Sequence, residues 1–365
     1  MTFLDLVDQD FSLDIATFPD VSVIVPTYNQ KFLSKLLDAL CEQSYTNFEI
    51  LVVENGEELQ TTKDIVTQYA RKRLQVRYIF SNRRGSNIAR NLGCRNAQAQ
   101  IIALTDDDCI PDENWIANIV RAHKIYPDAG AIGGRVELEF PSGRPDWLQS
   151  PLTLFLAEQD ELIDRYTEKD RKDYRLSHTC WEVDIRREEH FLVSANLSFK
   201  KKRFAETGGM VEFEDHKIDN NHLKVYTAHD ETTFIFDLRH YGDPGGVYDT
   251  TIQVKHIIPP SRLELGYLEN IFYATGFKEV FVQNYVRVYM GVEPQWVSEA
   301  QALKNTLLLG CIKEGERILE VEQARHKISH EPTTRIFIEI CCVCYSRYLS
   351  GICDGIKEFC SVDGL

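Results

Sequence analysis

The chain lacks the long apolar runs of a membrane-spanning protein. Its 365 residues are 43% hydrophobic and 27% charged, which is the balance of an ordinary globular protein. No stretch approaches the ~18 consecutive apolar residues of a transmembrane helix, and the most apolar segment, residues 336–352, contains Glu339 and Arg347. The first residues also lack the basic and apolar regions of a secretory signal. These absences predict a cytoplasmic protein, with contact at the inner face of the plasma membrane left open.

Basic charge and paired cysteines are also scarce. Lys and Arg number 41 against 56 Asp and Glu, giving a net charge of −15, and this argues against nucleic acid as a partner because phosphate backbones need basic surface. The 10 cysteines show neither a disulfide framework nor paired Cys-x-x-Cys spacing, which indicates free thiols in a reducing compartment. A zinc site around Cys341, Cys342 and Cys344 is the less favoured alternative.

Two phosphate-binding motifs are missing as well. No Gly-x-Gly-x-x-Gly and no Gly-x-x-x-x-Gly-Lys-Ser/Thr follows a predicted strand, which argues against a dinucleotide dehydrogenase and a P-loop NTPase. A sugar nucleotidyltransferase would place a glycine-rich basic loop after the first strand, but residues 27–30, Thr-Tyr-Asn-Gln, contain no glycine, lysine or arginine. An anionic substrate would therefore need a metal ion or a local group of arginines.

What the sequence does contain is a regular alternation of short apolar strands and amphipathic helices. Strand, helix, strand with short connections predicts βαβ units and a mostly parallel sheet. The expected fold is therefore α/β and Rossmann-like, with a central sheet flanked by helices and a C-terminal helical extension. Strands are predicted at 21–26, 48–53, 76–80, 101–104, 129–136, 191–199 and 251–256, and helices at about 32–43, 61–73, 85–99 and after His229.

The same pattern predicts the domain boundaries. Residues 1–20 form an acidic lead-in, 21–260 the α/β domain, and 261–365 a helical region. A charged insertion at 141–190 interrupts the domain, and its Trp147 and Trp181 are candidates for stacking on sugar rings or for the core. The aromatic C-terminal helices are expected to pack on the core, with subunit pairing and membrane contact as the alternatives.

Three consecutive acids, Asp106, Asp107 and Asp108, stand at the carboxyl end of the predicted strand 101–104. Ligands of open α/β sheets bind outside the carboxyl ends of strands, and adjacent carboxylates repel one another unless a cation or hydrogen-bond donors compensate them. Carboxylate oxygens are the usual ligands of Mg²⁺ and Mn²⁺. The stretch therefore predicts a metal-dependent nucleotide-sugar site, and the alternative is a solvated acidic turn that caps the next helix.

Six elements in this order resemble the inverting GT-A glycosyltransferases of family 2, the type found in bacterial polysaccharide biosynthesis. The resemblance covers roughly residues 21–260. The elements are the strand and loop at 21–29, Glu54-Asn55-Gly56 in the place of an Asp-Asp-Gly, Ala89-Arg90-Asn91, Asp106-x-Asp108 as an Asp-x-Asp motif, Ser194 to Phe199 on the acceptor side, and Asp230-Glu231-Thr232 as a Glu-Asp-Thr element with its acids exchanged.

The resemblance implies a donor site for a nucleoside-diphosphate sugar, most simply a UDP-sugar. Pro26, Thr27, Tyr28 and Glu54 would hold the base and ribose, and Arg90 would lie near the nucleotide unless it forms a surface ion pair. Asp106 would face the ribose or the metal, a Mg²⁺ or Mn²⁺ ion, and Asp108 would ligate that metal. Asp107, also counted on the donor side, would turn toward the protein.

The resemblance also implies the catalytic base. An acceptor hydroxyl has a pKa far above 7 and needs a carboxylate to take its proton. Glu231 is the preferred base and Asp230 its neighbour, although the exchanged order leaves the choice between them open. The alternative is that both acids cap the following helix.

Further residues receive roles from the same resemblance. His256 would be a third metal ligand, and Arg262, six residues later, would clamp the diphosphate, although a histidine at a strand end is often simply packed. Ala195 and Asn196 would lie on the acceptor side. The basic run Lys200–Arg203 is expected to be a solvated helix start rather than an acceptor or membrane contact.

The expected function is thus a metal-dependent inverting glycosyltransferase that acts on a saccharide or lipid-linked acceptor. A catalytically inactive binding or scaffold protein of the same fold is the main alternative. The identity of the sugar, the acceptor, the linkage and the oligomeric state is not encoded in any motif of the chain.

Overall fold

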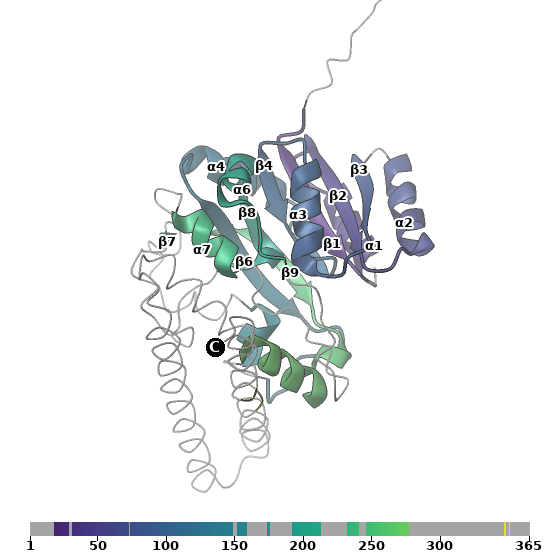
Figure 1. Cartoon of the computed structure of the whole chain (residues 1–365). Coiled ribbons are helices and arrows are strands. Elements are labelled where there is room, and N and C mark those ends of the chain that lie inside the picture. The colour runs from purple at the N-terminus through teal and green to yellow at the C-terminus, as the bar shows by residue number, and fades with distance from the viewer. Residues whose placement is uncertain are drawn as a thin grey trace, which may run out of the picture.

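A computed structural model describes residues 18–28, 31–72, 74–148, 152–158, 174–175, 192–212, 232–240 and 246–276, together with residues 347 and 350. Within these ranges a nine-stranded sheet runs in the order β3-β2-β1-β4-β8-β6-β9-β5, and β7 (Tyr174–Arg175) pairs with β9. Figure 1 shows that the long strands β6 and β9 extend from this sheet beyond the ends of β1 and β4. The predicted α/β fold class is confirmed.

The amino-terminal half of the sheet is parallel, as predicted. Four strands pair side by side in the same direction: β1 (Val21–Thr27), β2 (Phe48–Asn55), β3 (Val76–Ser81) and β4 (Ile101–Leu104). Every residue of β1 and β2 is buried, since helices cover both faces of a parallel sheet and leave no solvated side for polar alternation. Their carboxyl ends therefore meet at one edge, where Thr27 pairs with Glu54.

The second half of the sheet is mixed. β4 and β8 (Leu197–Lys200) run antiparallel, β8 and β6 (Ala131–Glu139) antiparallel, and β6 and β9 (Gly246–Ile257) parallel. Where the β6–β9 register shifts after Gly134, a Cβ on that glycine would lie 2.0 Å from the Ile252 carbonyl oxygen. Only a residue without a Cβ fits at this position, where the backbones of β6 and β9 approach closely.

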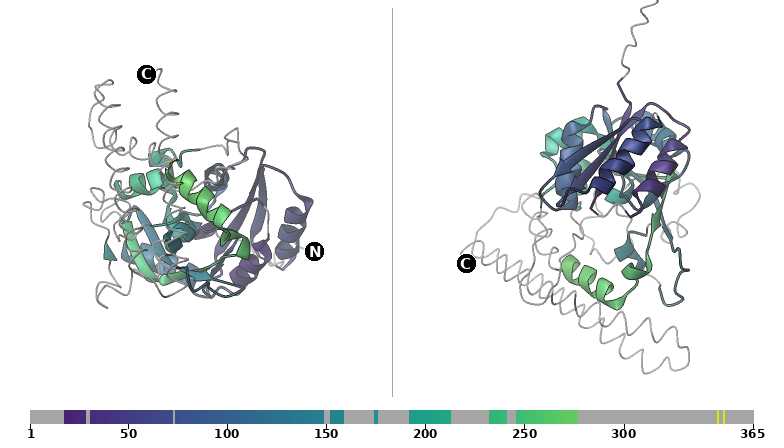
Figure 2. Two further views of the ribbon diagram at one scale, coloured as in Figure 1. Left: turned by 90° about the horizontal axis from the view of Figure 1, so that it is seen from below. Right: turned by 90° about the vertical axis from the view of Figure 1, so that its right-hand side faces the viewer.

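Two helical layers sandwich the sheet, and each forms a separate part of the core. Leucines at helical spacing on α1 (Leu33–Cys41) pack with α2 (Gln60–Arg71) and α4 (Trp115–Ile125) on one face. The other face is covered by α3 (Ser86–Asn96), α6 (Lys201–Thr207) and α7 (Thr232–His240). The views in Figure 2 show helices on both sides of the strands.

Three local predictions need correction. Residues 194–196 form a 3₁₀ turn, η4, rather than the continuation of a strand, because Asn196 turns its side chain inward to bind backbone carbonyls. β9 begins at Gly246, five residues before the predicted start at 251. A short strand, β5 (Cys109–Pro111), directly follows the acidic stretch and pairs antiparallel with β9.

The remaining elements agree with their predicted places. The basic run begins α6, where Lys201 donates to the Ala97 carbonyl at 2.5 Å and Arg203 pairs with Glu206. After β9 come the 3₁₀ turn η5 (Pro260–Arg262) and a helix over residues 265–276. Among the described residues, no helix has both the length and the apolarity that crossing a bilayer requires.

Candidate active site

The acidic stretch lies where β4 ends and β5 begins, at the carboxyl edge of the parallel half of the sheet. The Asp106 carbonyl accepts from the Cys109 amide at 3.0 Å and closes a tight turn between the strands. The turn points the three carboxylates in different directions, and each has a different partner. The trio is therefore three separate positions rather than one solvated acidic cap.

Asp106 pairs with Arg90. The Arg90 side chain on α3 is buried and donates from Nη2 to Asp106 Oδ1 at 2.7 Å, while 29% of the Asp106 side chain is exposed. Arg90 also donates to Asn87 Oδ1 at 3.3 Å. The ion pair predicted as an alternative for Arg90 exists. Its arginine is buried rather than on the surface, and it holds the partly exposed Asp106 carboxylate at the site.

Asp107 turns toward the protein, as the sequence indicated. Thr27 at the end of β1 donates its hydroxyl to Asp107 Oδ2 at 2.5 Å. Burial and the negative charge of Asp108 raise the pKa of Asp107 to about 7, although the Thr27 hydrogen bond acts in the opposite direction. One member of the trio is thus held close to neutrality, which reduces the repulsion within it.

Asp108 is buried and faces His256 and Arg262. Its Oδ1 lies 3.4 Å from His256 Nε2, and its Oδ2 accepts from Arg262 Nη2 at 2.7 Å. Burial alone would raise the pKa of Asp108, but His256 and Arg262 outweigh it and hold that pKa well below its usual range. Asp108 is therefore an ionised carboxylate at neutral pH.

His256 is oriented by a backbone carbonyl. Its Nδ1 lies 2.9 Å from the carbonyl oxygen of Leu156, and its Nε2 lies 2.8 Å from Arg262 Nη1. A carbonyl can only accept and a guanidinium can only donate, so Nδ1 carries the proton and Nε2 accepts from Arg262 with its lone pair. A histidine whose second nitrogen is held in this way is typical of metal ligands.

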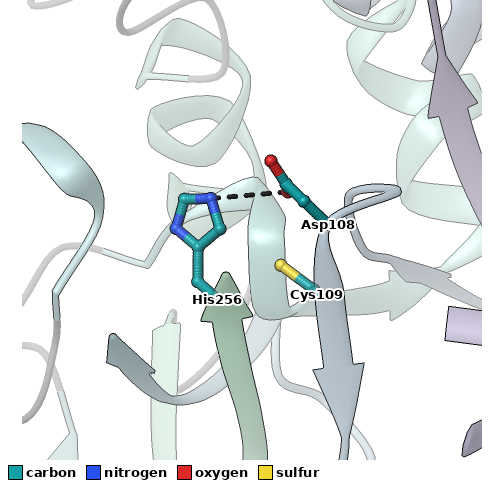
Figure 3. A group of neighbouring side chains, drawn as sticks. All are labelled: Asp108, Cys109 and His256. Carbon is teal, nitrogen blue, oxygen red and sulfur yellow. Dashed lines mark ion pairs between the residues drawn. The ribbon is translucent and has the colours of Figure 1, made fainter. Parts of the chain in front are cut away.

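Asp108, Cys109 and His256 form a candidate metal centre, in which one ligand atom from each residue lies within 4.8 Å of the others. Cys109 and His256 stand opposite each other in the β5–β9 ladder, and Figure 3 shows Asp108 turned toward the His256 ring with the Cys109 sulfur beside them. Burial and the adjacent acids raise the pKa of the Cys109 thiol well above its usual value. The centre therefore offers an oxygen and a nitrogen ligand, with a thiol that stays protonated.

The residues predicted to hold the nucleotide lie at the same edge. Pro26 and Thr27 are buried at the end of β1, and Tyr28 is 41% exposed with the Arg84 guanidinium 4.1 Å from its ring centre. Asn55 connects this edge to α3, since it donates to the Thr27 carbonyl and accepts from the Gly85 amide, both at 3.0 Å. Arg84 was not predicted, because a basic residue in a loop carries no sequence signal of its own.

Glu54 is fully buried and satisfied by its own chain. Its carboxylate accepts from the Leu59 amide at 2.9 Å, from the Tyr78 hydroxyl at 2.6 Å and from the Thr62 hydroxyl. Burial and this carboxylate raise the pKa of Tyr78. Glu54 shapes the loop after β2, and direct contact with a nucleotide stays a prediction.

Ala195 and Asn196, predicted on the acceptor side, are buried in η4. The Asn196 amide donates to the carbonyls of Arg135 and Ile252 at 2.9 and 3.0 Å, and its Oδ1 accepts from the Trp115 indole at 2.9 Å. This side chain braces β6, β9 and α4 against one another. A contact of these residues with an acceptor stays a prediction.

Several predicted residues lie outside the described part of the chain. They include both candidate bases, Asp230 and Glu231, which directly precede α7 in the sequence, as well as Trp181 and the C-terminal cysteines. Trp147 is described and is partly buried. The predicted boundaries at 141–190 and 261–365 also stay predictions.

The sequence of the chain is similar to that of known proteins. A model of the family described as "Glycosyl transferase family 2" matches residues 22–188, the segment that contains β1 to β6 and the acidic trio. This segment, slightly less than half of the chain, matches glycosyl transferase family 2. The resemblance inferred from the motifs is thereby confirmed.

Individual proteins are also similar to the chain. The chain is 36% identical over 135 residues to glycosyltransferase AglE of Haloferax volcanii, covering 35% of this chain and 43% of that protein. It is 23% identical over 253 residues to the glucosyl-dolichyl phosphate glucuronosyltransferase of the same organism, covering 68% of this chain and 72% of the relative. The chain thus spans less than half the length of the first relative.

A solved structure also aligns with the chain. The mannosyltransferase PcManGT from Pyrobaculum calidifontis, in complex with GDP-Man and Mn²⁺, aligns with a TM-score of 0.46 at 16% identity over 93% of this chain and 74% of its own.

Proposed function

We propose that this chain transfers a sugar from a nucleoside-diphosphate sugar to a hydroxyl of a saccharide or lipid-linked acceptor, with inversion at the anomeric carbon. The observation that carries the proposal is the convergence of Asp108, His256 and Arg262 beside the Arg90–Asp106 pair, at the carboxyl edge of a family 2 domain. A lipid-linked acceptor is supported by the second relative, which is named a glucosyl-dolichyl phosphate glucuronosyltransferase.

The residues present fit a divalent cation. An ionised carboxylate and an imidazole with its Nε2 lone pair directed inward are an O,N donor set, which suits Mn²⁺ better than Mg²⁺ because Mg²⁺ prefers oxygen ligands alone. Asp108 and His256 would hold the cation, and when bound it supplies Lewis-acid stabilisation of the leaving diphosphate.

Each of the other residues would contact a different part of the donor. Asp106, partly exposed and oriented by Arg90, would accept from ribose hydroxyls. Tyr28 and Arg84 provide a flat, partly exposed platform for the base, since aromatic and guanidinium planes both stack on nucleobases. Arg262 supplies a positive charge at the diphosphate.

The base for the acceptor hydroxyl is proposed to be Glu231, with Asp230 as its neighbour. Deprotonation of a hydroxyl with a high pKa during attack needs a carboxylate in hydrogen-bond reach. Glu231→Gln should abolish transfer while donor binding is largely retained, because the amide cannot take the proton. If Asp230→Asn has this effect and Glu231→Gln does not, the two roles are exchanged.

The most direct test is a panel of UDP-, GDP- and dTDP-sugars, scored for release of the nucleoside diphosphate with Mn²⁺, Mg²⁺ or EDTA. We expect release with one donor, highest with Mn²⁺ and lost in EDTA. No release with any donor in any metal would contradict the enzymatic proposal in favour of a binding protein of this fold. Release that is undiminished in EDTA would contradict only the role of the cation.

A further inference from the structure

Arg262 binds the same two side chains that form the candidate metal centre. Its Nη1 donates to His256 Nε2 at 2.8 Å and its Nη2 donates to Asp108 Oδ2 at 2.7 Å. The His256 Nδ1–H is already used by the Leu156 carbonyl, so Nε2 has a single lone pair to offer. That lone pair accepts either the Arg262 N–H or a cation, and the two contacts exclude each other.

The position of Arg262 allows it to leave. It ends the short turn η5, and its side chain is 30% exposed whereas that of Asp108 is 8% exposed. The guanidinium therefore covers the buried carboxylate from the solvent side, on a long side chain with several rotatable bonds.

Electrostatics also predicts when Arg262 leaves. Two positive groups on Asp108 repel each other at short range in a partly buried site. An incoming diphosphate provides the anion that accepts the displaced guanidinium, since arginine forms bidentate hydrogen bonds with phosphate oxygens. Entry of the cation is thus unfavourable by itself and favourable together with a diphosphate.

We propose that a divalent cation displaces Arg262 from Asp108 and His256, and that Arg262 then binds the donor diphosphate, so that cation and nucleotide bind cooperatively. The identity of the anion as a donor diphosphate rests on the proposed function. Cooperativity of this kind is reciprocal, so each ligand raises the affinity for the other by the same factor. Arg262 is in this scheme a positioning residue that competes with the cation before the donor arrives.

The test is a calorimetric titration of the full chain with Mn²⁺ alone and with Mn²⁺ plus UDP. Arg262→Met removes the charge and both hydrogen bonds, and it should bind Mn²⁺ about 10-fold tighter than the wild type in the absence of UDP. The increase in Mn²⁺ affinity that UDP causes in the wild type should largely disappear in this variant. Arg121→Met is the matched control, because it removes an arginine from an ion pair with Asp249 outside the site.

Two results would overturn the inference. One is an Arg262→Met variant that binds Mn²⁺ no more tightly than the wild type, and the other is a UDP effect that this variant retains in full. If either occurs while the donor panel shows Mn²⁺-dependent release, the proposed function stands and the exchange of ligands does not. If neither protein binds Mn²⁺ and no donor is cleaved, both proposals fail.

A second variant covers the case in which Arg262→Met does not fold. Arg262→Lys keeps the charge but cannot reach both partners with one planar group. Its affinity for Mn²⁺ without UDP should lie between those of the wild type and of Arg262→Met, and an affinity below that of the wild type would contradict the exchange.

Discussion

The two ends of the parallel half of the sheet both hold buried carboxylates, but in different surroundings. At the amino end, Glu49 on β2 accepts from the Ser22 hydroxyl and the Gln98 amide, both at 2.6 Å, and from Arg77 at 2.7 and 3.1 Å. Both carboxylate oxygens of Glu49 therefore accept hydrogen bonds from donors of the protein itself. At the carboxyl end, three adjacent acids share two arginines, one threonine and one histidine.

The difference separates a structural carboxylate from a functional one. Glu49 has a complete set of donors and gains nothing from a ligand. Asp108 instead faces an arginine that a cation is proposed to displace, and Asp106 keeps a partly exposed side. A buried acid is therefore a candidate for chemistry when its partners are exchangeable, and burial alone does not make it one. The following predictions test this distinction.

Asp108→Asn should have the largest effect. The neutral amide would lose a charged cation ligand, so we expect release of nucleoside diphosphate to fall on the order of 1000-fold, or about 4 kcal/mol. The free energy of unfolding should change by no more than about 1 kcal/mol. Steady-state kinetics and urea unfolding measure the two quantities. Asp112→Asn, an exposed acid of the same segment, is the control and should retain activity.

Glu49→Gln should show the opposite pattern. The substitution leaves Arg77 without its carboxylate partner and turns an amide NH₂ group toward the donors that surround Glu49. We expect the free energy of unfolding to fall by about 2 kcal/mol. This value is discounted for solvent screening, because 40% of the Arg77 side chain is exposed. Affinity for UDP, measured by calorimetry on folded protein, should not change. The exposed Glu57→Gln is the control. A selective loss of UDP binding in Glu49→Gln would remove the distinction between the two ends.

Asp107→Asn should have the smallest effect, and one that depends on pH. Folding raises the pKa of Asp107 from its ordinary value of 3.8 to about 7, so between these values the folded state holds a proton that the unfolded state has lost. Its contribution to stability therefore falls as the pH rises through this range. Asn mimics the neutral acid, so its stability relative to the wild type should be clearly greater at pH 8 than at pH 4.5.

This pH dependence is measured by urea unfolding in EDTA, so that a bound cation does not contribute. A stabilisation by Asp107→Asn that is equal at pH 4.5 and pH 8 would mean that Asp107 is ionised in the folded protein, and that the three acids carry their full charge.

Much of the fold was predictable because its signals are local. The alternation of buried strands with leucines at helical spacing in α1 predicted β1 to β4 and the helices between them. The family motifs predicted the edge at which the site lies. The turn at 194–196 was missed because Asn196 is oriented by Trp115 and by two carbonyls from other strands, and no local pattern encodes such partners.

The sequence by itself determined that three acids end a buried strand, because apolar runs and the residues that follow them are local properties. The tertiary structure decided how the three differ. Arg262 reaches Asp108 across 154 positions, and Leu156 orients His256 across 100. These partners meet only because β5 pairs with β9, and strand pairing depends on the packing of the whole sheet. Charge and hydrogen bonding at close range then assign one acid to an arginine, one to a near-neutral state and one to the candidate metal centre.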